Sequence, residues 1–187
     1  MLKLRPEHTK HDNTRQIRKK NPSLIYKVSN LYTENIYIVV AVPTLPPVQP
    51  PLQCTVDVIF VVDESTSIGN ESFEMMKSFL RQLVSRLDID SGNTRVGLVT
   101  FSTSVGTVFN LTDHSSVASL QLAISSLVYR RGDTHTATAL AYVRTTMMTS
   151  AAGDRPNVPN IVAVLTDGES TDPRATEVSM TFIMSNN

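Results

Sequence analysis

The chain has very little cysteine. Cys54 is the only cysteine among the 187 residues. A single cysteine cannot form a disulfide within the chain, and it cannot supply the thiolates of a cysteine-based zinc cluster. Whether Cys54 is free or pairs with a cysteine of another chain stays open.

Long apolar runs are absent as well. A membrane-spanning helix takes about 20 predominantly apolar residues, and the longest candidate in the N-terminal part, Ile36 to Val42, is far shorter. The same run lies too far from the start of the chain for a signal peptide, because the residues before it are mostly polar. We therefore expect no membrane span, and no export signal is readable.

Several catalytic and nucleotide-binding motifs are missing. The chain contains no G-x-x-x-x-G-K, no G-x-G-x-x-G and no G-x-S-x-G. A phosphotransferase that uses Asp63 as its nucleophile would want a second carboxylate two residues later, where this chain has Ser65. We therefore expect that the protein is not an enzyme; a hydrolase that uses a metal-bound water is the remaining alternative.

The charge is balanced in total but unevenly distributed. Residues 1–30 hold eight of the 17 basic side chains and two of the 17 acidic ones, so nine basic and fifteen acidic side chains follow. Hydrophobic residues make up 41% of the chain and charged residues 18%, which indicates a folded core. The acidic remainder suits a cation site and gives no indication of nucleic-acid binding.

Composition divides the chain into three parts. We predict a disordered basic leader at residues 1–35, a proline-rich linker at residues 36–52 and one folded domain at residues 53–187. The linker assignment rests on five closely spaced prolines, Pro43, Pro46, Pro47, Pro50 and Pro51.

Strand and helix patterns alternate along the folded part. Short β-branched runs predict strands, and apolar residues three or four apart predict helices. This alternation predicts an α/β fold with a doubly wound, mostly parallel sheet. We expect strands at residues 56–62, 95–102, 106–111 and 160–166, and helices at residues 70–87, 117–127, from about 136 and from about 173.

The most informative segment is the apolar run that begins at Val56 and ends in Asp63-Glu64-Ser65-Thr66-Ser67. Such a run predicts a strand buried on both faces. Ligands of doubly wound sheets bind beyond the carboxyl ends of the strands, so Asp63, Ser65 and Ser67 are candidate site residues. All three offer oxygen alone, which favours a hard cation such as Mg²⁺.

Two more segments can reach the same edge of the sheet. One is the turn before a predicted helix, with Thr134 after Gly132-Asp133, and the other is Asp167-Gly168 at the end of the second apolar strand. Hydroxyl ligands add no charge, so a Mg²⁺ ion held by two carboxylates keeps its attraction for another anion. We therefore expect the metal to bind a carboxylate that a protein partner supplies.

These three segments resemble the metal-ion-dependent adhesion site of von Willebrand factor type A domains. The resemblance covers roughly residues 54–187, with the segments in the family's order. It is greatest to matrix members: collagen A domains, matrilins and integrin inserted domains. The resemblance implies a Rossmann-like fold that continues further, so we predict a sheet incomplete at its C-terminal edge.

The resemblance also implies ligand roles. Ser65 and Ser67 would bind the metal directly, whereas Asp63 and Asp167 would act mainly through water. Thr134 would bind directly when an acidic partner is present. Mg²⁺ is the expected ion, with Mn²⁺ or Ca²⁺ as substitutes. The acidic residues Glu64 and Asp133 depart from the small residues often found there.

The resulting functional prediction is an adhesion module of a secreted, collagen-like matrix protein. An intracellular scaffold domain for complex assembly, in the cytoplasm, is the alternative. Asn70 and Asn110 lie in glycosylation sequons, which matter if the chain is exported. Asn70 is also a candidate N-cap of its helix.

Overall fold

The computed structural model describes residues 24–29, 35–41, 55–168 and 170–185. One six-stranded sheet runs through it in the order β1-β2-β6-β3-β4-β5. Its strands are β1 (Leu24–Ser29), β2 (Asn35–Ala41), β3 (Val56–Asp63), β4 (Thr94–Phe101), β5 (Val105–Phe109) and β6 (Asn160–Thr166). The central strands β6, β3 and β4 are parallel, and β5, β2 and β1 each join antiparallel. The sheet is therefore mixed, with a parallel centre.

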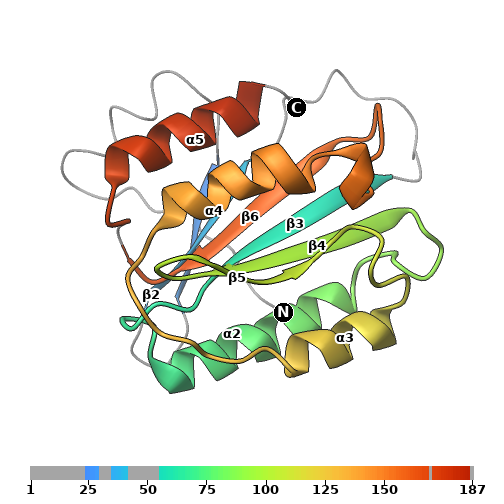
Figure 1. Cartoon of the computed structure of the whole chain (residues 1–187). Helices are drawn as coiled ribbons and strands as arrows, with labels where there is room; N and C mark the ends of the chain where they lie inside the picture. The colour runs from blue at the N-terminus through green and yellow to red at the C-terminus, as the bar shows by residue number, and fades with distance from the viewer. Residues whose placement is uncertain (1–23, 30–34, 42–54, 169, 186–187) are drawn as a thin grey trace.

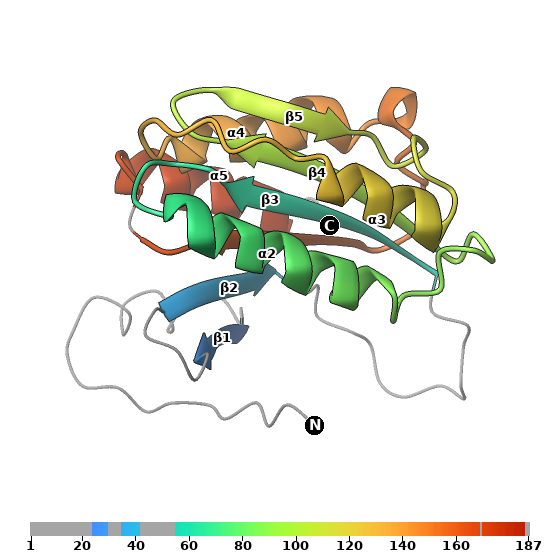
Figure 2. The same cartoon turned by 90° about the horizontal axis from the view of Figure 1, so that it is seen from below.

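Helices cover both faces of this sheet (Figures 1 and 2). On one face lie α2 (Gly69–Val84) and α3 (Val117–Ser125). On the other lie α4 (Thr136–Tyr142), which continues into a π-helical turn (Val143–Met147), and α5 (Pro173–Ser185). A short 3₁₀ turn, Ser150–Ala152, precedes β6. The predicted α/β, doubly wound architecture is confirmed.

Strand β3 lies at the centre and is buried on both sides, as the sequence predicts. Phe60 and Val62 pack in the cluster that α2 and α3 cover, and Ile59 and Val61 pack in the cluster that α4 and α5 cover. Successive side chains of a strand point to opposite faces, so an unbroken apolar run fits only a strand with helices on both sides. The carboxyl end of β3 is thereby fixed in a rigid core.

The structure differs from the sequence prediction at residues 24–29 and 35–41. They fall within the segments predicted as leader and linker, yet they form β1 and β2. Strand β2 pairs antiparallel with β6, with Val39 opposite Val164. Isoleucine, valine and tyrosine are frequent in both segments, and such residues favour strands beside an available sheet edge. The rest of both segments, including Cys54, lies outside the described residues.

The start of α2 also differs from the prediction. The helix begins at Gly69, which places Asn70 inside its first turn and not at the cap. The N–H of Gly69 donates to the hydroxyl of Tyr129 at 3.0 Å, so a side chain distant in sequence satisfies the helix end.

Among the described residues, no helix combines the length and the apolar character that a membrane crossing requires.

Candidate metal site

Asp63 is the last residue of β3, and its side chain is fully buried. Its Oδ1 accepts a hydrogen bond from the backbone N–H of Ser65 at 2.8 Å. Its Oδ2 accepts one from the hydroxyl of Thr166 at 2.7 Å, at the end of the neighbouring β6. The two adjacent strand ends thus hold the carboxylate in one orientation at the edge that the sequence predicts.

A chain of hydroxyl contacts connects this edge to the second predicted carboxylate. The hydroxyls of Ser65 and Ser67 lie 3.0 Å apart. The Ser67 hydroxyl donates to Oδ1 of Asp167 at 3.1 Å, across 100 residues of sequence. Four of the five predicted metal residues are therefore joined by direct hydrogen bonds, in the order Asp63, Ser65, Ser67 and Asp167.

The fifth residue, Thr134, reaches the same edge through its backbone. Its N–H donates to the Thr171 hydroxyl at 3.2 Å, and its carbonyl accepts from the N–H of Thr171 at 2.9 Å. Two residues earlier, Gly132 exchanges hydrogen bonds with Thr66, which lies between the two serines. The turn with Thr134 is thus attached to both other segments, although no hydrogen bond joins Thr134 directly to Ser65, Ser67 or Asp167.

This turn depends on glycine at position 132. Gly132 has a φ of +123°, and a Cβ there would lie 2.5 Å from the Thr103 hydroxyl oxygen. A side chain would therefore be strained and would collide with the loop after β4. Asp133, beside it, is exposed and lies 3.8 Å from the ring of His135, so its carboxylate does not enter the chain of hydroxyl contacts.

Electrostatics at the site favour a bound cation. Burial raises the pKa of Asp63; hydrogen bonds from Thr166 and Ser65 oppose this shift, and the nearby Asp167 adds to it. In the described part of the chain, no lysine, arginine or histidine forms an ion pair with Asp63 or Asp167. The buried carboxylate of Asp63 thus lies near a second acid with no cationic partner among the described residues, which is costly for its charged form.

The donor set indicates which cation fits. Carboxylate and hydroxyl oxygens suit Mg²⁺, Mn²⁺ or Ca²⁺, whereas zinc sites usually include imidazole or thiolate. Within the described ranges no three His, Cys, Asp or Glu side chains lie together in a way that could hold a metal ion. Any metal here would therefore rely on the hydroxyls of Ser65 and Ser67 in addition to the two aspartates.

Glu64 points away from this chain of contacts. Its carboxylate is fully buried and accepts a hydrogen bond from Thr100 of β4 at 3.1 Å. Burial raises the pKa of Glu64, while Thr100 and the charge of Arg130 oppose that shift. A Cβ at Gly106 would lie 2.3 Å from the Glu64 carboxylate, so glycine there leaves room for the acid. Glu64 thus connects the end of β3 to β4 through Thr100 and packs against Gly106 of β5.

Two further residues support the site, and the sequence analysis did not identify them. Thr166 holds Asp63, and its position directly before Asp167 at a parallel strand end is a signal that could have indicated it. Tyr129 donates its hydroxyl to the carbonyl of Ser65 at 2.7 Å while it accepts from Gly69. It thereby fixes the loop between β3 and α2, and no local pattern reveals that contact.

The chain is similar to matrix proteins. It is 41% identical over 118 residues to the collagen alpha-4(VI) chain of Mus musculus. This match covers 62% of this chain and 5% of the collagen chain. It is 36% identical over 126 residues to vitrin of Mus musculus, covering 67% of this chain and 19% of that protein. For matrilin-1 of Gallus gallus the identity is 35% over 116 residues, with 62% and 24% covered. The chain spans less than a third of each of these curated relatives.

The chain is also similar to a solved structure of a matrix protein. The structure is that of proximal thread matrix protein 1 from the mussel byssus, with zinc in its MIDAS motif, the metal-ion-dependent adhesion site. It matches this chain with a TM-score of 0.66 and 28% sequence identity. The match covers 71% of this chain and 36% of that one. A family model described as von Willebrand factor type A domain matches residues 57–185. These residues hold all five predicted metal residues, and the chain belongs to the von Willebrand factor type A domain family.

Proposed function

We propose that this domain binds a divalent cation at the edge formed by β3 and β6 and, through the cation, an acidic residue of a protein ligand. The observation that carries the proposal is the buried carboxylate of Asp63, which has hydrogen-bond donors but no cationic partner among the described residues. A cation from solution would offset the charge that burial makes unfavourable.

Each residue has a proposed role. Ser65 and Ser67 bind the metal through their hydroxyls, and Asp63 and Asp167 hold its water ligands. Thr134 replaces a water when an acidic partner binds. The octahedral preference of Mg²⁺, which keeps several waters, leaves a position for the partner's carboxylate. The zinc-occupied site of the mussel relative supports metal binding at this motif, while the all-oxygen donor set favours Mg²⁺ or Mn²⁺ here.

The relatives support a matrix role for the whole protein. They include a collagen chain and a matrilin, so we propose an extracellular, secreted module that binds other proteins and has no catalytic activity. In that setting Asn110, half-buried beside Asp113, and Asn70, exposed on the first turn of α2, are candidate glycosylation sites. Glycan on Asn110 would exclude the alternative of an intracellular scaffold.

Isothermal titration calorimetry of the chain with Mg²⁺ and Mn²⁺ tests the metal claim. We expect one binding event per chain, absent in Asp63→Ala and retained in Asp113→Ala, which removes an exposed carboxylate elsewhere. No heat with folded protein, or equal affinity in Asp63→Ala, would exclude the site. Metal-dependent turnover of an ester or phosphate substrate would favour a hydrolase instead.

A further inference from the structure

The antiparallel hairpin of β1 and β2 closes one edge of the sheet (blue in Figure 2). Both strands lie outside residues 57–185, the part of the chain that matches the family model. The hairpin is therefore an addition to the matched domain. It supplies the neighbour of β6 on the side away from β3. Within the described sheet, β6 would be an unpaired edge without it, and unpaired apolar edges favour aggregation.

The pairing of β2 with β6 runs up to the candidate metal site. Strand β6 pairs with β3 only as far as Leu165. The next residue, Thr166, pairs with Tyr37 of β2. Among the described residues, Thr166 thus has its sheet partner in the hairpin, while its hydroxyl orients Asp63. Asp167 follows it directly in the chain, so the hairpin holds the backbone next to both carboxylates.

This backbone support bears on metal binding. Strand ends with few backbone partners open locally at a lower free energy than the core. An opening at Thr166 would remove the hydroxyl that donates to Oδ2 of Asp63 and would displace Asp167. Contacts that hold metal ligands in place raise metal affinity. The hairpin can therefore act on the site through the backbone of β6, without contributing a ligand.

The chain is long enough for the hairpin to pair with β6 of its own copy. Strand β2 ends at Ala41, opposite Val162 of β6, and β3 begins at Val56. Strands β2 and β3 are two strand spacings apart, about 10 Å. The fourteen residues between Ala41 and Val56 can span more than about 40 Å. Such a tether gives an effective concentration on the order of 1 mM, far above that of a second copy in dilute solution.

We infer that the hairpin of β1 and β2 is a positioning element of the metal site, whose pairing with β6 strengthens cation binding. The inference rests on the function proposed above. Coupling between two binding equilibria is reciprocal, so a bound cation strengthens the pairing of the hairpin by the same factor. The hairpin and the cation together fix the end of β6.

The test compares Mg²⁺ binding of the unsubstituted chain and Val39→Pro by calorimetry. Strand β2 has a neighbour on each side, so proline at Val39 removes a hydrogen bond of the sheet and disrupts the hairpin. We expect about tenfold weaker Mg²⁺ binding. Val39→Gly, which weakens the strand and keeps its N–H, should fall between the two. Thr44→Pro, which adds a proline beyond the end of β2, should bind as the unsubstituted chain does.

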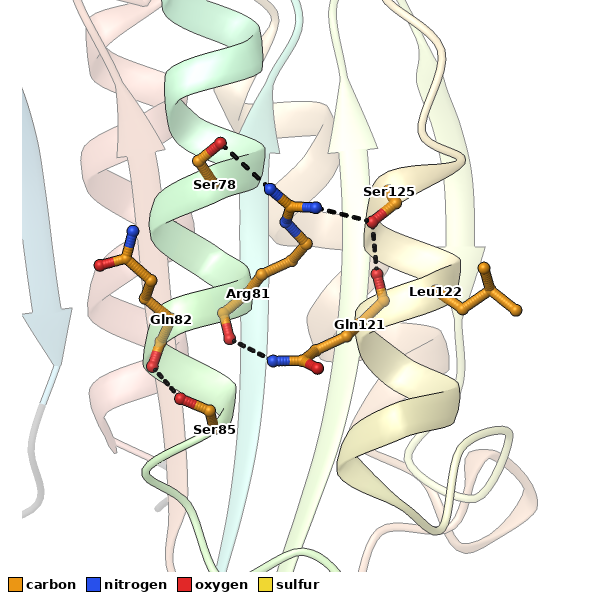
Figure 3. A pocket seen from close by; sticks show the side chains of 7 residues that line it. All are labelled: Ser78, Arg81, Gln82, Ser85, Gln121, Leu122 and Ser125. Atoms are coloured by element: carbon orange, nitrogen blue, oxygen red, sulfur yellow. Dashed lines mark hydrogen bonds between the residues drawn. The ribbon is translucent and has the colours of Figure 1, made fainter.

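A second control loosens a contact elsewhere in the fold. The side-chain amide of Gln121 donates to the carbonyl of Arg81 at 2.9 Å and joins α3 to α2 beside the pocket between them (Figure 3). This hydrogen bond involves neither β2 nor β6. Gln121→Ala should therefore leave the Mg²⁺ affinity unchanged.

Hydrogen exchange in EDTA shows whether the effect passes through the end of β6. The N–H of Ser65 donates to Asp63, and the N–H of Arg155 donates to Asp57 at the other end of β3. Val39→Pro should speed exchange of the Ser65 amide and leave the rate of the Arg155 amide as it was. Equal acceleration of both amides would indicate general destabilisation and would overturn the inference.

The remaining outcomes separate the inference from the proposed function. Equal Mg²⁺ affinity of Val39→Pro and the unsubstituted chain would overturn the inference and leave the metal site intact. No Mg²⁺ binding by the unsubstituted chain, with faster Ser65 exchange in Val39→Pro, would reject the metal site itself, and the inference with it. A dimer that Val39→Pro dissociates in sedimentation analysis would overturn the assignment of the hairpin to its own copy.

Discussion

Strand β3 carries a buried carboxylate at each end, and the protein satisfies the two differently. Asp57, at the amino end, accepts from Arg155 at three points: Nε at 2.9 Å, Nη2 at 2.5 Å and the backbone N–H at 3.0 Å. Asp63, at the carboxyl end, accepts only from a hydroxyl and an amide. Both side chains are fully buried. Burial of an acid therefore does not by itself indicate a metal site; Asp63 is distinguished by the absence of an ion pair together with the hydroxyl and carboxylate oxygens beside it that lead to the surface.

The two ends also differ in what they connect. Arg155 donates further to three backbone carbonyls, Val56, Gly92 and Asn93, so the amino end of β3 is an internal, closed network. The hydroxyls beside Asp63 lead outward to the exposed Ser67 and the half-buried Asp167. The first network stabilises the fold, and the second leaves ligands available to an ion from solution.

The largest effect is expected at the closed end. Arg155→Ala leaves the Asp57 carboxylate buried without its partner, and we expect a loss of about 3–5 kcal/mol in the free energy of unfolding. Urea unfolding should show the same loss with Mg²⁺ and with EDTA. The exposed Arg86→Ala is the control. If Mg²⁺ restored the lost stability, the claim that only the carboxyl end of β3 binds a metal ion would be contradicted.

The next effect is expected at the open end. Asp63→Asn keeps the shape and removes the charge, so the metal-free stability should change by no more than about 1 kcal/mol. The unsubstituted chain should gain about 2.7 kcal/mol in Mg²⁺ at a hundred times the dissociation constant, and the variant should gain nothing. Thermal unfolding across a Mg²⁺ series measures both. Equal gains would show that Asp63 is not a metal residue.

A smaller effect should come from the residue that orients Asp63. Thr166→Val removes the hydroxyl that donates to Oδ2 and keeps the side-chain shape. Because such supporting contacts hold metal ligands in place, we expect about a tenfold weaker Mg²⁺ affinity in calorimetry. Thr145→Val, which loses a hydroxyl on the exposed side of the helix after α4, should bind Mg²⁺ as before. An equal loss of Mg²⁺ affinity in Thr145→Val would show that the effect is not specific to the hydroxyl of Thr166.

The sequence predicts the central strand β3 and the oxygen donors that follow it because these patterns are local. The β-branched run of β3 and the oxygen donors directly after it lie in one short segment. The partnership of Asp57 with Arg155 spans 98 residues and depends on which loop meets the strand. Tyr129 was missed for the same reason: its role follows from a tertiary contact and not from periodicity. Thr166, directly before Asp167 at a strand end, carried a local signal that the sequence analysis did not use.

The pairing of β2 with β6 was beyond the sequence for a different reason. A strand pattern indicates that a segment can extend, but it does not specify the edge that it joins. Residues 35–41 read as a short apolar run beside prolines, and the linker interpretation used the prolines. The run itself carried the strand signal.

The smallest expected effect is a pH dependence. Because burial raises the pKa of Asp63 above 3.8, the metal-free folded state holds this proton more tightly than the unfolded state. Stability from this group is then present at low pH and is lost as the pH rises through the raised pKa. In EDTA, the unsubstituted chain should lose stability relative to Asp63→Asn as the pH rises from about 4 through the raised pKa of Asp63. A gain over that range would contradict the raised pKa.

The comparison between the two ends of β3 is tested most directly by diffraction from crystals grown with Mn²⁺. Anomalous difference maps locate the metal without reference to stability or activity. We predict one peak bonded to the hydroxyl oxygens of Ser65 and Ser67, and none beside Asp57. A folded chain with no peak at the carboxyl end of β3, or with its peak bound by other groups, would contradict the account.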